Sequence, residues 1–191
     1  DRQSGGSLPT PGTTNLKNFS GNWYGTASPV VSTANSMEPG YASHIPVAYG
    51  GLATNPGGAP DILGPASANF DYTPWLAVGT DTDGGAVGFE GDFTEVWVDD
   101  AGAQTGGEGR VQEGVDSVTG STVNVAAGTY EEQVEITATL TLQGVGPTSI
   151  IKSPPTLALS FATPGNANKP VIYVHGADDV VIKNLTVDGA G

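Results

Sequence analysis

The most constraining feature of the chain is a series of very short apolar runs between residues 121 and 191. Most runs hold three or four residues, rich in Val, Ile and Leu, and are bounded by Gly, Pro, Asp or Asn. β-Branched residues between turn-forming residues at this spacing predict short strands. The runs are 123–125, 134–136, 140–142, 150–151, 171–174, 180–182 and 185–187.

Strands this short favour a solenoid, in which each coil adds one strand to each face and buries its apolar side chains between neighbouring coils. A β-sandwich is the alternative, although sandwiches favour longer strands joined by hairpin turns of the Asn-Gly kind. The abundance of turn formers, with 29 Gly and 14 Pro in 191 residues, fits either architecture. We therefore predict an all-β fold, a parallel β-helix segment first and a β-sandwich second.

Three regions differ in composition. Residues 1–78 are rich in Gly, Pro, Ser, Thr and Asn, and they predict a loop-rich β region. Residues 79–108 form an acidic linker with one apolar–polar alternation at 93–98, which predicts a single half-buried strand. Residues 109–191 are expected to hold a helix followed by the first coils of the solenoid.

The helix is predicted over 109–118. Val111, Val115 and Val118 recur at spacings of four and three, so they share one face of a short helix. An open solenoid end exposes apolar side chains and unpaired strand edges. We therefore expect this helix to cover the open end of the first coil.

Two sequence patterns resemble a known family. The stretch 123–132 reads VNVAAGTYEE after the predicted helix, and 174–187 repeats a strand-turn-strand pattern. Both resemble the amino-terminal coils of pectin-lyase-like, right-handed parallel β-helix proteins. Near the front, 22–26 (NWYGT) and 70–76 (FDYTPWL) resemble the last coil of β-helix modules in large bacterial surface proteins. The resemblance implies a right-handed solenoid with a short helical cap.

The same resemblance places a closing coil before an opening coil, as in one link of a longer array. The function it implies is a structural repeat unit of an extracellular filament or cell-surface protein, bacterial in origin. Such units would assemble head to tail by coil stacking or strand complementation. The expected partners are other copies of the chain or adjacent repeats in one longer chain, of which this sequence would be a piece.

Two alternatives remain at the sequence level. One is a fragment of a polysaccharide-active β-helix enzyme, a lyase, hydrolase or esterase, and the other is a carbohydrate-binding adhesin module.

Asp178 and Asp179 are adjacent, so on a strand they would point to opposite faces. The two histidines, His44 and His175, lie far apart in the sequence. Without a convincing catalytic set, we expect the chain not to be an enzyme.

Five residues stand out as candidate binding or modification sites. Asp81 and Asp83 alternate before two glycines, as at the start of a calcium-binding loop. Trp23 and Trp75 carry flat rings that could stack on sugars, although such rings also seal solenoid cores. Asn18 begins an Asn-Phe-Ser acceptor for N-glycosylation. No other cofactor is expected.

The charge argues against two classes of partner. The net charge is −14 with six Lys and Arg, so the chain lacks the clustered cations that bind nucleic acid or anionic membrane surfaces. No apolar run reaches transmembrane length, so no membrane insertion is expected. With no cysteine, neither disulfides nor thiolate metal sites can form.

Overall fold

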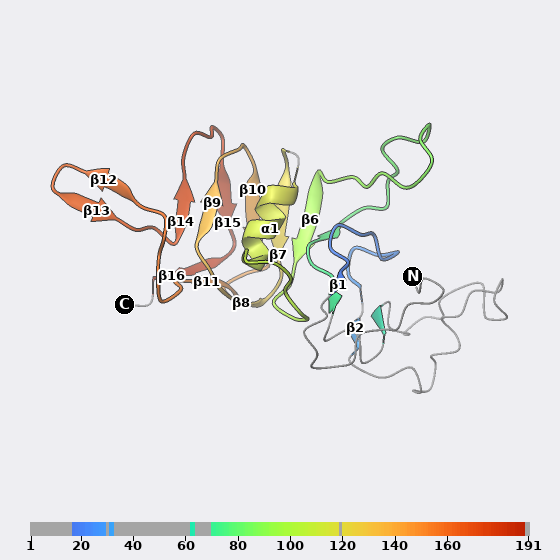
Figure 1. Ribbon diagram of the computed structural model, residues 1–191, viewed down its shortest axis with the longest axis horizontal. Helices are drawn as coiled ribbons and strands as arrows, with labels where there is room; N and C mark the ends of the chain where they lie inside the picture. The colour runs from blue at the N-terminus through green and yellow to red at the C-terminus, as the bar shows by residue number, and fades with distance from the viewer. Residues whose placement is uncertain (1–16, 30, 33–61, 64–69, 119, 190–191) are drawn as a thin grey trace.

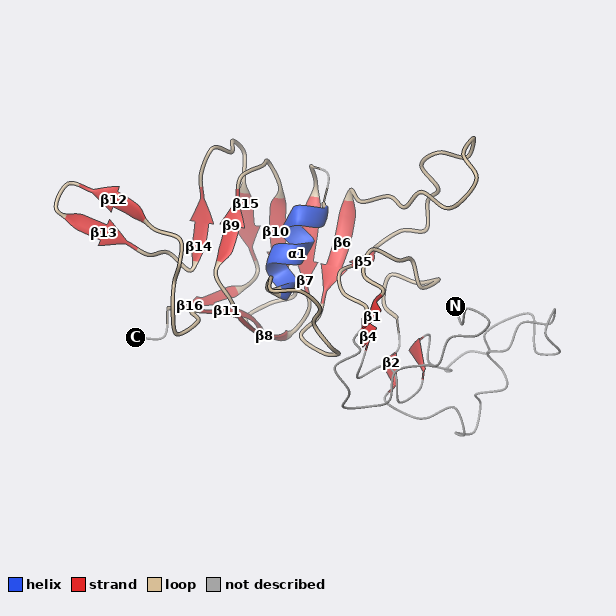
Figure 2. Ribbon diagram, viewed as in Figure 1, coloured by secondary structure: helices blue, strands red, loops and turns tan. Residues whose placement is uncertain are grey.

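Parallel strand pairing dominates the described chain from residue 95 onward. The structure, a computed structural model, describes residues 17–29, 31–32, 62–63, 70–118 and 120–189. These residues form short strands and one helix, α1 (Arg110–Ser117), so the fold class is all-β in its broad sense (Figure 2). Within the described parts, no helix is long and apolar enough to cross a membrane.

The largest sheet runs along the long axis of the molecule (Figure 1). Its neighbouring strands pair in parallel, except that β5 and β6 are antiparallel. In order across the sheet, the strands are β15 (Val181–Lys183), β10 (Thr141–Gly144), β7 (Thr122–Val125), β6 (Glu95–Val98) and β5 (Trp75–Leu76).

Two smaller parallel sheets accompany it. The chain passes through the three sheets in the same order twice, and then begins a third pass with β15 and β16. The smaller sheets are β8 (Gly128–Glu131), β11 (Ser149–Lys152) and β16 (Thr186–Asp188) in one, and β9 (Val134–Ile136) and β14 (Ile172–Val174) in the other.

Three further strand pairs lie outside these sheets. Two of them are parallel and come from the amino-terminal region, and the third is an antiparallel hairpin that projects beside β14 (Figure 1). They are β1 (Lys17–Asn18) with β4 (Phe70–Asp71), β2 (Val31–Ser32) with β3 (Ile62–Leu63), and β12 (Phe161–Thr163) with β13 (Asn166–Asn168).

The predicted helix is confirmed as α1. Val111 and Val115 are buried as predicted, and Val118 follows the helix and packs against the core. Gly114 lets the helix approach closely, because a Cβ there would lie 2.7 Å from a methyl of Val98. The helix contacts β6, β7 and β9, and so covers the first pass of the chain.

The carboxylate of Glu132, the residue after β8, caps this helix. Gly109 at the N-cap position has no side chain to offer, and Glu132 accepts the N–H groups of Val111 at 3.0 Å and Gln112 at 2.9 Å. These are two of the donors that a helix start leaves without an intrahelical partner. Burial raises the pKa of the Glu132 carboxyl, and the hydrogen bonds from the helix oppose that rise.

Most predicted strands are confirmed, and the differences have physical causes. No apolar run predicts β8, because its four residues, GTYE, include a glycine and a glutamate, which are poor strand residues. Its place is set by parallel pairing with β11, where Glu131 lies opposite Lys152 and binds it at 2.9 Å. The β12–β13 hairpin was also missed, because its strands are exposed and carry little apolar pattern.

Candidate assembly surface

Each of the three parallel sheets ends at a strand from the carboxyl-terminal part of the chain. These edge strands are β15, β16 and β14. They lie on the side of the molecule away from β5 (Figure 2). We call these three strands, with the side chains of Val174, Ile182 and Val187, the end layer.

A row of apolar side chains crosses the largest sheet in register. Val96 pairs with Val123, Val123 with Leu142, and Leu142 with Ile182. The first three are completely buried, whereas Ile182 is 40% exposed. Since all four hold the same register position, the difference reflects a missing neighbour beyond β15 in the described chain, not a change of face.

The other two sheets show the same change. Ile151 is fully buried and pairs with Val187, which is 47% exposed. Ile136 is fully buried and pairs with Val174, which is 38% exposed. The end layer therefore combines three edge strands with three uncovered apolar rows.

The opposite end of the largest sheet is covered. β5 runs antiparallel to β6, and the N–H of Leu76 in β5 donates to the carbonyl of Asn22 at 3.0 Å. Asn22 thus binds β5, and β5 in turn pairs with β6 of the same chain.

A side chain of α1 closes the edge of β9 in the same region. The Gln112 amide nitrogen donates to the Glu135 carbonyl at 3.2 Å, and its oxygen accepts the Glu135 N–H at 2.7 Å. The amide thereby supplies the two hydrogen bonds that a neighbouring strand would make at this residue.

The two ends of the set of parallel sheets therefore differ: the end with β5 is covered, and the end layer is not.

An aromatic stack borders the end layer. Tyr173 of β14 stacks on Phe161 of the hairpin at 5.8 Å between ring centroids, and on His175 at 4.5 Å. His175 Nε2 lies 2.6 Å from a carboxylate oxygen of Glu135. The rings face one another, and the arrangement anchors the hairpin beside β14. His44 lies outside the described residues.

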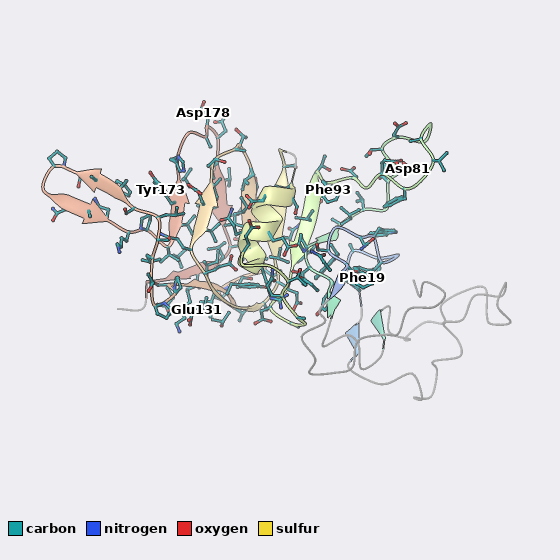
Figure 3. All side chains as sticks on the ribbon, viewed as in Figure 1. Phe19, Asp81, Phe93, Glu131, Tyr173 and Asp178 are labelled. Atoms are coloured by element: carbon teal, nitrogen blue, oxygen red, sulfur yellow. The ribbon has the colours of Figure 1, made fainter. Side chains whose placement is uncertain are left out.

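The predicted calcium residues lie in a projecting loop, where Figure 3 shows Asp81. Asp81 accepts the N–H of Asp83 at 3.1 Å, and Asp83 accepts the N–H of Gly85 at 3.1 Å. Both carboxylates therefore stabilise turns of their own loop. In the described parts of the chain, no three His, Asp or Glu side chains are grouped so that they could hold a metal ion.

The two predicted sugar-binding rings are packed against protein. Trp75 is 6% exposed, packs with Tyr72, and donates its indole N–H to the Ala27 carbonyl at 3.1 Å. It presents no open face on which a sugar could stack. Trp23 is half-buried against the core, and Gly79 lies against its indole ring.

Asn18 lies in β1 and is exposed, as a glycosylation acceptor has to be. Its side-chain oxygen Oδ1 accepts the backbone N–H of Ser20 at 2.8 Å and the hydroxyl of Ser20 at 2.6 Å. Both bonds hold the side chain in a local turn.

Open grooves beside β8 and β11 contain carboxylates, the groups that glycoside hydrolysis requires in pairs. One groove has a volume of about 580 Å³ and is lined by Glu131, Lys152 and Lys169 among others. Glu131 is bound to Lys152, and the neighbouring Glu132 is bound to the start of α1. The grooves therefore hold an ion pair and a helix cap, with no free pair of carboxylates from these residues.

The long-range caps were not predicted from the sequence. The Glu132 carboxylate binds the N–H of Gln112, 20 residues away, and the Gln112 side chain binds the backbone of Glu135, 23 residues away. No short motif signals either contact. The strands of the end layer were predicted from their apolar runs, whereas the exposure of their side chains is seen only in the structure.

No family model, no curated protein and no solved structure matches this chain.

Proposed function

We propose that the chain is a structural repeat unit of an extracellular filament or cell-surface protein of bacterial origin, and that its role is not catalytic. In this proposal the parallel sheets are coils of a right-handed β-helix of the pectin-lyase-like kind. Support comes from the repeated order of the strands and from their parallel, in-register pairing.

One observation carries the proposal: three apolar rows become exposed together at the end layer. Another set of strands placed on β14, β15 and β16 would cover all three rows. The same strands would satisfy the backbone groups along three sheet edges. Addition of strands would thus bury the exposed apolar side chains and pair the open backbone groups in one step.

Magnitudes indicate which interaction has to dominate. Covering three aliphatic side chains that are already about half-buried contributes about 1 kcal/mol each. Association costs at least about 4 kcal/mol in lost rigid-body freedom. Apolar contact alone does not offset that cost. Backbone pairing along the three edges therefore has to supply the remainder.

The occupant is another copy of the chain, or an adjacent repeat in a longer one. The covered end with β5 differs from the end layer, so a contact between the two ends is heterologous. Heterologous contacts that do not close into a ring propagate as fibres. The expected assembly is a head-to-tail filament along the axis of the sheets.

Changing Val187 to Lys is expected to weaken self-association by about tenfold or more, because a charge would be buried at the contact. Sedimentation velocity over a concentration series measures the change. Val87→Lys is the matched control, since Val87 is fully exposed in a loop. Equal association by both variants would contradict the proposal. A wild-type chain that stays monomeric throughout the series would contradict assembly between separate copies.

A further inference from the structure

Asp71, at the end of β4, is a fully buried carboxylate with only one oxygen satisfied. Its Oδ2 accepts the N–H of Thr105 at 2.6 Å and the hydroxyl of Thr105 at 2.8 Å. Its Oδ1 has no hydrogen-bond partner. A buried carboxylate oxygen without a donor is costly, so an unmatched one marks a candidate position for a ligand.

A second unmatched oxygen belongs to the neighbour of Thr105. Gln104 donates its amide N–H groups to Glu113 at 2.8 Å and to the Thr105 carbonyl at 3.2 Å. Its Oε1 is buried and accepts no hydrogen bond. Thr73, two residues beyond Asp71, likewise has a buried hydroxyl without a partner.

Two carboxylates and one guanidinium lie in the region of these oxygens. Burial raises the pKa of Glu113, and the charges of Asp71 and Glu108 raise it further, while hydrogen bonds from Gln104 and Ser20 oppose the rise. Gln104 binds Glu113 and the adjacent Thr105 binds Asp71, so both carboxylates contact the same short loop. The guanidinium of Arg110 donates to the Gly102 carbonyl at 2.8 Å, and its Nη1 is buried without a hydrogen-bond partner. Burial raises the pKa of Tyr72 and of Glu132, and the charge of Arg110 opposes both rises.

We propose that Asp71 Oδ1 and Gln104 Oε1 bind a calcium ion, with the Thr73 hydroxyl and the Glu113 carboxylate completing the oxygen set. Carboxylate, amide and hydroxyl oxygens are hard ligands of the kind calcium prefers. The ion would join the segment 70–73 to the loop before α1 and to α1 itself. It would thereby hold the covered end of the molecule together. The proposal stands independently of self-assembly.

Calcium binding is tested by titrating CaCl₂ into protein dialysed against EDTA, using isothermal calorimetry, with thermal unfolding as a second readout. With only two carboxylates in the set, a dissociation constant on the order of 10⁻⁴ M is expected. Asp71→Asn keeps a carbonyl acceptor for Thr105 and removes the charge. It is expected to weaken calcium binding by about tenfold or more.

Asp81→Asn is the matched control, because Asp81 belongs to the loop first predicted to bind calcium, and it should bind calcium as the wild type does. Gln104→Ala, a second variant, is expected to weaken binding too, and it carries the test if circular dichroism shows that Asp71→Asn is unfolded. The proposal would be overturned if the wild type bound no calcium up to about 10 mM. It would also be overturned by unchanged binding in a folded Asp71→Asn variant or in Gln104→Ala, or by loss of binding in Asp81→Asn alone.

Discussion

Replacing Leu142 with Ala is expected to lower the free energy of unfolding by about 3 kcal/mol. Leu142 is completely buried and lies between Val123 and Ile182 in the row that crosses the largest sheet. Truncation removes its apolar contacts and leaves a cavity that the flanking strands cannot fill. Equilibrium unfolding in guanidinium chloride, followed by circular dichroism, measures the loss.

Ile182→Ala provides the internal comparison, because Ile182 occupies the next position in the same row. With 40% of its surface exposed, it should cost the monomer no more than about 1 kcal/mol. Both variants are compared at a concentration where the chain is monomeric. Equal losses would mean that the end layer is covered within the monomer, contrary to the exposure of its side chains.

Gly144→Ala is expected to destabilise the fold by about 3 kcal/mol. A Cβ at this buried position of β10 would overlap the backbone carbonyl of Asn184 and approach the Cβ atoms of Ser149 and Leu185 to 2.7 and 2.8 Å. The chain bends sharply here between successive strands, so these atoms have little room to move. The same unfolding measurement detects the effect.

Gly107→Ala is the control for the extra methyl group. Nothing lies within 4 Å of a Cβ at Gly107, and its backbone does not require positive φ. Its unfolding midpoint should therefore stay close to that of the wild type. If both alanine variants unfold at the same midpoint, the close approach of the Asn184 turn to Gly144 is not a feature of the folded protein.

Local pattern located most of the parallel strands from residue 95 onward. Apolar runs such as 134–136 and 140–142 are flanked by turn residues, and the valines of α1 recur at helical spacing. β8 could not be predicted this way, because the ladder with β11 defines it and its own composition does not. Pairing with a distant strand therefore sets the structure of β8, whose residues have only a weak preference of their own for a strand.

The candidate sites depended more strongly on tertiary packing. Nothing in the sequence around Trp75 distinguishes an exposed ring from one buried with Tyr72. Similarly, Asp71 does not stand out in sequence, because its burial and its contact with Thr105, 34 residues away, arise only in the folded chain. By contrast, Asp81 and Asp83 looked like ligands from spacing alone, and their carboxylates cap local turns.

Hydrogen exchange at the end layer tests the account most directly. The N–H of Val181 donates to the Leu140 carbonyl, so the N–H of Ile182 faces the open side of β15. If another strand layer adds there, the Ile182 amide should exchange about tenfold more slowly at high protein concentration than at low concentration. Amides of the buried strand β7 should not change. An Ile182 amide that exchanges at the same rate in the assembled and dilute protein would contradict the proposal that the end layer is where the chain extends.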